Sequence, residues 1–188
     1  NFLENGEFAP STPSGSFSQK ALSEWLAHAN WADGVLIAGD LGRNSETAIL
    51  IEKFLGKTSA AVTLTKDAID YITSAPHAAL QRQNTLLILS LSQLQRLGIA
   101  AKFTKPVTFG MDLLRLAEWL HEFTSEHQPY IVVKHLDNLV AAVDGQVSST
   151  TLKEDKQIWR VETAAHAAVW WLQNPNKPFE AITTSMLH

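Results

Sequence analysis

The chain has 188 residues, of which 45% are hydrophobic, so it can bury one sizeable core and we expect a single domain. Its net charge is −4, and its 15 Lys and Arg residues are spread along the chain, which argues against nucleic acid or an anionic membrane surface as a partner. The absence of Cys excludes disulfides, thiolate metal sites and Cys nucleophiles. No apolar run reaches the ~18 residues that a membrane span needs, and the N-terminus lacks the pattern of a signal peptide, so we expect a cytoplasmic protein.

The first stretch of the sequence, residues 1–17, is rich in Ser, Pro and Gly and has no sustained periodicity. This composition predicts an N-terminal arm or loop, followed by one α/β domain over 18–188. From Ser18 onward, an apolar stripe at helical spacing predicts a first helix, with Gly34 after its end. The stripe consists of Ala21, Leu22, Trp25, Leu26 and Ala29.

Short apolar runs then alternate with helical patterns. Strands are predicted at VLIAG (35–39), AAVTL (60–64), TLLIL (85–89) and PYIVVK (129–134). One helix is predicted from Ser45 to Leu55, ended by Gly56, and a second helical stretch follows the next strand and reaches Leu80. A third helix should begin at Ser92, and a fourth should cover 110–127. Continuous apolar runs of this length are typical of strands that helices cover on both faces, so we predict a mostly parallel sheet.

The alternation of strands and helices stops near the C-terminus. NLVAAVDGQVSST (138–150) predicts two antiparallel strands joined by Asp144-Gly145, a dipeptide suited to a tight hairpin turn. Two helices should follow, one from about Val161 to Gln173 and one from Pro178. The first should pack on the sheet through Val161, Ala164, Ala165, Ala168, Val169 and Leu172. We therefore predict a doubly wound α/β layer sandwich, in which ligands bind beyond the carboxyl ends of the strands.

Four segments carry a family resemblance in their sequence and in their order: WADGVLIAGDLGRNSETAILIEKFL (31–55), KDAIDYI (66–72), VVKHLDNLVAAVDGQVSS (132–149) and KPFEAITTSMLH (177–188). From about Trp31 to its end, the chain resembles the ribokinase-like NAD(P)H-hydrate dehydratases, a carbohydrate kinase-like family. These nucleotide-dependent lyases phosphorylate the hydroxyl of a hydrated nicotinamide cofactor and eliminate phosphate. The resemblance implies a ribokinase-like layered sandwich and, in an active enzyme, ATP or ADP with Mg²⁺. The family's opening strands have no counterpart here, so either the domain is incomplete or its sheet is completed differently.

The resemblance also implies a ligand site. The family's G-x-G-L-G turn corresponds to residues 39–43, where Asp40 places a carboxylate beside the expected phosphate and would repel it. Of the two aspartates in the family's Asp-Ala-Asp-Ala-Leu only the second, Asp67, is kept, and the family's Lys-Gly becomes Lys134-His135. Nucleotide or substrate binding is therefore implied for Gly39, Leu41, Gly42, Arg43, Asp67 and Lys134.

This chain departs further from the family's pattern in the catalytic segments. Its G-[ST]-G-D corresponds to residues 159–162, which implies Glu162 as the base but puts Trp159 and Val161 where glycine amides should wrap an anion. Its His-Pro-Gly-Glu corresponds to residues 90–93, without an imidazole or a carboxylate. We therefore expect a degenerate, non-catalytic domain that retains weak binding of a nucleotide or an NAD(P)H-like ligand, or that acts as an interaction module. The alternative is an active dehydratase or small-molecule kinase.

Each of these positions also has a purely structural interpretation. The glycine turn can simply connect a strand to a helix, and Glu162 can stabilise a helix N-terminus by ~0.3–1 kcal/mol. No metal site is predicted, because His121 and His127 are six residues apart and face different sides of a helix. A homo-oligomer or an N-terminal partner segment that completes the sheet would require an exposed sheet edge or an apolar patch.

Overall fold

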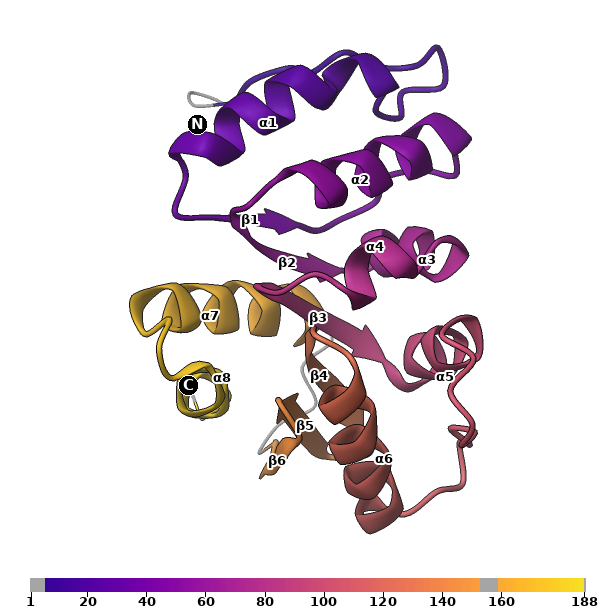
Figure 1. The fold of residues 1–188 in the computed structure, drawn as a ribbon, viewed down its shortest axis with the longest axis vertical. Helices are drawn as coiled ribbons and strands as arrows, with labels where there is room; N and C mark the ends of the chain where they lie inside the picture. The colour runs from indigo at the N-terminus through magenta and orange to yellow at the C-terminus, as the bar shows by residue number, and fades with distance from the viewer. Residues whose placement is uncertain (1–5, 153–158, 188) are drawn as a thin grey trace.

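Six strands form a single sheet in the computed structural model, which describes residues 6–152 and 159–187 (Figure 1). The first four strands pair in parallel, and each of the last two pairs antiparallel with the strand before it. They are β1 (Gly34–Ile37), β2 (Ala61–Thr65), β3 (Thr85–Ser90), β4 (Tyr130–His135), β5 (Asn138–Val143) and β6 (Gln146–Thr151). The fold class is therefore as predicted, a mostly parallel sheet flanked by helices.

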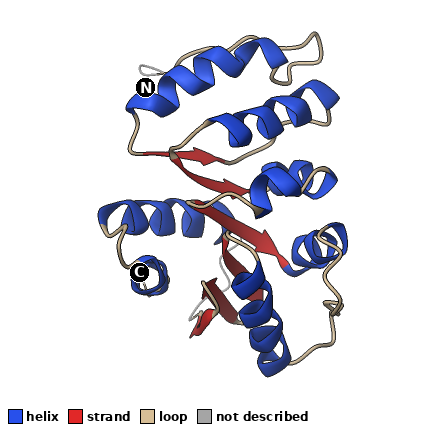
Figure 2. Ribbon diagram, in the orientation of Figure 1, coloured by secondary structure: helices blue, strands red, loops and turns tan. Residues whose placement is uncertain are grey.

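Helices cover both faces of the sheet (Figure 2). They are the short 3₁₀ helix η1 (Gln19–Ala21), α1 (Leu22–Trp31), α2 (Ser45–Lys57), α3 (Asp67–Ser74), α4 (His77–Leu80), α5 (Leu91–Ala100), α6 (Leu113–Glu126), α7 (Trp159–Gln173) and α8 (Pro178–Ser185). No helix in the described part of the chain is both long enough and apolar enough to cross a membrane.

Two predicted helix boundaries are wrong. The single helix predicted up to Leu80 is divided into α3 and α4, because Pro76 disfavours a helical backbone at Ala75, which has φ −142°. Helix α2 continues past Gly56 to Lys57 and ends at Thr58, whose amide donates to the carbonyl of Phe54. At Ala75 a local backbone preference therefore decided where the helix stops.

The winding of the sheet differs from the doubly wound prediction. The spatial strand order follows the chain order from β1 to β6, without a reversal. Parallel crossovers of one hand that advance in one direction place their helices on the same face, so α2 to α6 lie together there. The opposite face is covered by α7 and α8, which the chain adds after the hairpin (Figure 1). The described sheet therefore has no point at which the strand order reverses.

The core has two layers because neighbouring strand residues point to opposite faces. Leu87 and Leu89 of β3 pack under the crossover helices, whereas Leu86 and Ile88 pack under α7 and α8. The hairpin is confirmed, since Asp144 and Gly145 have φ values of 48° and 78°.

The buried face of α7 is only partly the predicted one. Ala164 and Ala168 of the predicted stripe are buried, together with Ala167 and Trp171, while Val169 is 52% exposed. Trp171 packs edge-on against Tyr130 of β4, with ring centroids 5.4 Å apart. Of the three Trp residues on α7, Trp171 is thus the one that lies on the buried face against the sheet.

Candidate functional site

The candidate site lies where β1, β2 and β3 end and the loops to α2, α3 and α5 begin. The strand register brings these ends level, with Ile37 beside Leu64 and Thr65 beside Ile88. Ser90 lies beside Lys134 of β4. Side chains that leave the carboxyl ends of four parallel strands can therefore meet along one edge.

The turn after β1 contains two glycines in the left-handed region, Gly39 with φ 108° and Gly42 with φ 70°. At Gly42 a Cβ atom would also lie only 2.5 Å from the Oγ of Ser16 in the N-terminal arm. Gly42 is thus required both by its backbone angle and by its close neighbour. Around Gly39 there is nothing within 4 Å of a Cβ position, so only its φ favours glycine.

The backbone amides of this turn are bonded to side chains of the same chain. Leu41 N–H donates to Asp67 Oδ2 at 3.0 Å, and Gly42 N–H donates to Asp40 Oδ1 at 3.1 Å. Asn44 N–H donates to the hydroxyl oxygen of Tyr71 at 3.0 Å. The amides that could wrap a phosphate are therefore bonded to carboxylates and a phenol.

Helix α3 and the start of α2 brace the turn further. The Tyr71 hydroxyl donates to the Gly42 carbonyl at 2.5 Å, so this phenol bridges two points of the turn. Asn44 is the N-cap of α2, and its side-chain oxygen accepts from Glu46 N–H at 2.8 Å. The turn is thus held from both sides by hydrogen bonds within the chain.

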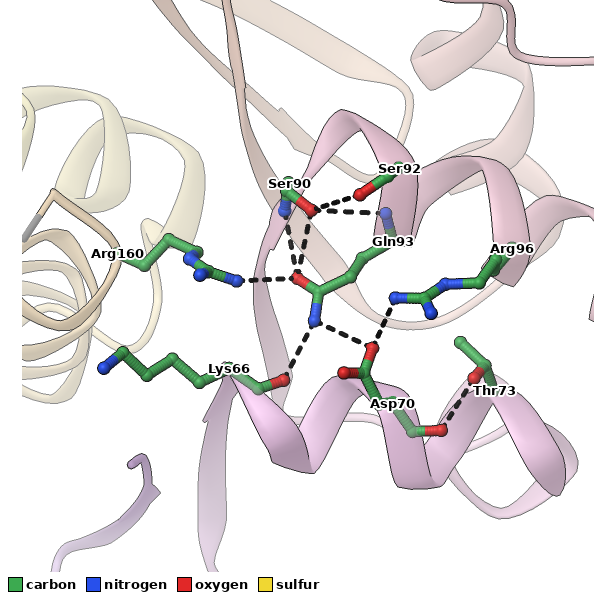
Figure 3. A network of polar contacts seen from close by, with 8 residues as sticks. All are labelled: Lys66, Asp70, Thr73, Ser90, Ser92, Gln93, Arg96 and Arg160. Atoms are coloured by element: carbon green, nitrogen blue, oxygen red, sulfur yellow. Dashed lines mark hydrogen bonds and ion pairs between the residues drawn. The ribbon is translucent and has the colours of Figure 1, made fainter. Parts of the chain in front are cut away.

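A second polar network centres on Gln93, whose side chain is only 3% exposed (Figure 3). Its Oε1 accepts from Arg160 Nη1 at 3.2 Å and from Ser90 N–H at 3.1 Å. Its Nε2 donates to the Lys66 carbonyl at 3.0 Å and to Asp70 Oδ1 at 3.0 Å. One buried amide therefore connects α3, α5 and the first turn of α7, with its donors and its acceptor all used.

Two further contacts define the charge of this network. Asp70 Oδ1 also accepts from Arg96 Nη2 at 2.6 Å, an ion pair between two half-exposed side chains. Arg160 reaches the network from α7, on the opposite face of the sheet (Figure 3). The network holds two guanidinium groups and one carboxylate, so its fixed charge is positive.

Lys66, at the junction of β2 and α3, has an unusual backbone with φ 52° and ψ −125°. A residue other than glycine costs about 1–3 kcal/mol in such a conformation, and strained residues of this kind cluster at functional sites. Its carbonyl accepts from both Gln93 Nε2 and Ile69 N–H, and these bonds hold the strained angle in place.

The predicted site residues are only partly brought together. Leu41 and Asp67 are in direct contact through the 3.0 Å hydrogen bond, and Arg43 is exposed beside them. Lys134 is the penultimate residue of β4 and, by strand alternation, lies on the α7 side with Val132. Glu162 stands in the first turn of α7. Among the described residues, no group of three or more His, Cys, Asp or Glu side chains is placed to hold a metal ion.

The sequence did not indicate Asp70, Arg96 or Arg160 as members of a site. One local signal was present, since Ser90 and Gln93 have the Ser-x-x-Gln spacing of a capping box, and that box forms at the start of α5. The contact from Arg160 had no such signal, because it joins residues 67 positions apart.

Comparison with known proteins gives the fold of the chain. No family model and no curated protein matches the sequence. Among solved structures, the chain is similar to a ribokinase-like superfamily protein of Enterococcus faecalis, with a TM-score of 0.62 and 14% identity. The fold is ribokinase-like. The aligned part covers 88% of this chain and 57% of the Enterococcus protein.

A hypothetical protein of Streptococcus mutans has the same likeness, with a TM-score of 0.62, 12% identity, and coverage of 88% of this chain and 58% of that protein. The chain thus spans less than two thirds of the length of both structures. At these identities the likeness extends to the ribokinase-like fold alone.

Proposed function

We propose that this chain is a non-catalytic, NAD(P)H-hydrate dehydratase-like domain that acts by binding. The observation that carries the proposal is the bonding of the glycine turn, where the amides of Leu41 and Gly42 donate to Asp67 and Asp40. A phosphate at such a turn is held by those same amides. Since two carboxylates take that place, the residues present do not fit a nucleotide phosphate here.

The Gln93 network supports the same conclusion. Gln93 stands at the position that aligns with the glutamate of the family's His-Pro-Gly-Glu, and an amide cannot accept a proton as a carboxylate can. Its donors and acceptor are bonded to Lys66, Asp70, Ser90 and Arg160. A group bonded in this way supports the packing of three helices and has no bond left for a substrate.

An active nucleotide-dependent dehydratase or kinase is the second candidate. It is favoured by the first turn of α7, where Arg160 reaches the carboxyl ends of the strands and Glu162 follows two residues later. In that case Glu162 would serve as the base and Lys134 would lie near the phosphates.

Calorimetric titration of ATP, ADP and NADPH, with and without Mg²⁺, separates the two candidates. The non-catalytic domain should give no heat, or a dissociation constant in the millimolar range. Micromolar binding by the unaltered chain would overturn the proposal, and NAD(P)H-hydrate repair would then be assayed with Glu162→Gln as the test of the base. A paired Asp40→Gly, Asp67→Asn variant serves as the comparison, because it removes both carboxylate charges from the turn and should bind nucleotide more tightly than the unaltered chain.

A further inference from the structure

The edge of the sheet at β1 has a partner strand on one side only. Within the described residues β1 pairs with β2 and with no other strand. A groove of about 820 Å³ runs along this edge beneath α1, with apolar walls that include Trp25, Ala29 and Phe54. Phe8 and Trp31, which also line it, are 95% and 79% exposed. Exposed aromatic side chains beside an unpaired strand are typical of an interaction surface.

A second hollow lies on the other face of the same strand. It has a volume of about 230 Å³ and lies between β1, β2 and α7, lined among others by Leu36, Val169 and Leu172. Leu36 is 39% exposed and Val169 is 52% exposed. Gly34, Val35 and Leu36 line both hollows, so the two cavities flank one strand.

This arrangement matches the geometry of an added strand. Successive side chains of a strand point to opposite faces of the sheet. A strand placed beside β1 would therefore send one set of side chains into the groove under α1 and the other set into the hollow beside Val169. A helix would present one apolar stripe and could fill only one of them. Since both hollows are apolar, the incoming segment should be apolar at consecutive positions, as in the interior of a parallel sheet.

The charge of the groove restricts the occupant further. Glu7 and Glu24 line it together with His28, which contacts Glu7 at 2.9 Å, and the residues that line it in the described part of the chain include no Lys or Arg. A second copy of the chain, paired β1 to β1 about a two-fold axis, would bring these carboxylates toward their own counterparts. A segment flanked by Lys or Arg meets the same rim with opposite charge.

We propose that β1 accepts an extended strand from a partner polypeptide, apolar at consecutive positions and flanked by basic residues, which becomes the next strand of the sheet. This site is separate from the turn and the Gln93 network, and it is tested with a different ligand. The absence of nucleotide binding and the absence of strand binding are therefore distinguishable results.

The probe is a synthetic peptide with a run of alternating Val and Ile residues between pairs of Lys residues, carrying a fluorophore for anisotropy titration. The unaltered chain should bind it with a micromolar dissociation constant. Leu36→Lys, which puts a charge on the edge strand, should weaken binding about tenfold or more. Ile99→Lys is the matched control, since Ile99 is a 70% exposed aliphatic residue on α5, and it should bind as the unaltered chain does. Trp31→Ala should also weaken binding, and it changes a side chain that the fold leaves exposed.

Two control peptides test the mode of binding. N-methylation of alternate amides removes strand pairing, and replacement of Lys by Glu reverses the charge, so both peptides should bind much more weakly. Equal binding of either control peptide, no binding of the Lys-flanked peptide, or no effect of both Leu36→Lys and Trp31→Ala would overturn the proposal. Sedimentation velocity adds a further decisive result. A dimer that Leu36→Lys dissociates would show that a second copy, and not a basic partner, covers this edge.

Discussion

The carboxylate of Asp67 accepts a hydrogen bond from the backbone amide of Leu41 across 3.0 Å, and so joins the start of α3 to the turn after β1. The sequence resemblance implied ligand binding for both residues. In this chain they bond to each other. The pair closes the turn and joins the start of α3 to the end of β1.

The Asp67 bond should contribute to stability. Replacing Asp67 with Ala leaves the amide of the buried Leu41 without its partner, so we expect the free energy of unfolding to fall by about 1–3 kcal/mol in urea denaturation. Asp67→Asn keeps an acceptor oxygen and should lose less. Asp40→Ala is the matched control, because its bond to Gly42 N–H is exposed and water can replace it. Equal losses for Asp67→Ala and Asp40→Ala would contradict this account.

Gln93 should also contribute to stability, because its buried side chain joins three helices. Gln93→Ala removes the shared partner of Arg160, Asp70 and the Lys66 carbonyl, and we expect a loss of about 1–3 kcal/mol by the same measurement. Gln93→Glu keeps the acceptor for Arg160 but turns an oxygen toward two other acceptors, so it should also be destabilising.

Ser92→Ala provides the comparison for Gln93. Ser92 is exposed one position earlier on α5, and its hydroxyl is hydrogen-bonded to that of Ser90 (Figure 3). Water can replace this exposed bond, so Ser92→Ala should change stability by no more than about 0.5 kcal/mol. A Gln93→Glu protein as stable as the unaltered chain would show that the Nε2 bonds contribute little.

The β5–β6 hairpin should depend on Gly145. Its φ is +78°, and a Cβ atom there would lie 2.5 Å from Ser125 Oγ. Gly145→Ala should therefore lower the melting temperature and cost about 1–2 kcal/mol from backbone conformation alone. Gly110→Ala has nothing within 4 Å of its Cβ position and should be close to neutral. Similar melting temperatures for the two variants would argue against the turn as a determinant of stability.

Stability should fall in mild acid because of His127. Burial against Phe123, with ring centroids 4.5 Å apart, lowers the pKa of His127, and the charge of Glu126 opposes this with a smaller effect. Below about pH 6.5 the unfolded chain binds the proton more readily than the folded chain, so the free energy of unfolding decreases as pH falls from there toward the lowered pKa. His127→Gln should flatten this part of the stability curve.

The effect of Glu126 provides a check in the opposite direction. Glu126→Gln removes the charge that raises the pKa of His127, so the folded-state pKa should fall further and the loss of stability in acid should become steeper. Urea denaturation at a series of pH values measures both slopes. A curve that is unchanged by His127→Gln would assign the acid sensitivity to other groups.

Much of the secondary structure follows from local sequence. The strands VLIAG, AAVTL, TLLIL and PYIVVK were predictable because a strand buried on both faces must be apolar at consecutive positions, and each lies within a residue or two of its observed range. The hairpin was predictable because Asp144-Gly145 suits positive φ angles. The glycine turn was also visible, and its expected place at the carboxyl end of β1 is observed.

The arrangement of these elements depended on contacts between distant residues. Trp171 packs edge-on against Tyr130 on the buried face of α7. The hydrogen bond from Arg160 to Gln93 joins α7 to the site from the other face of the sheet. The direction of each crossover, and with it the unpaired edge at β1, is likewise decided by packing between elements. By itself the sequence determined which segments are strands and helices and where the turns fall, because periodicity and turn chemistry are local. The tertiary structure alone decided which amides of the turn are satisfied, because Leu41 and Asn44 donate to side chains 26 and 27 positions away. It also decided which edge of the described sheet has no partner strand, because the spatial order of the strands joins segments that are distant in sequence.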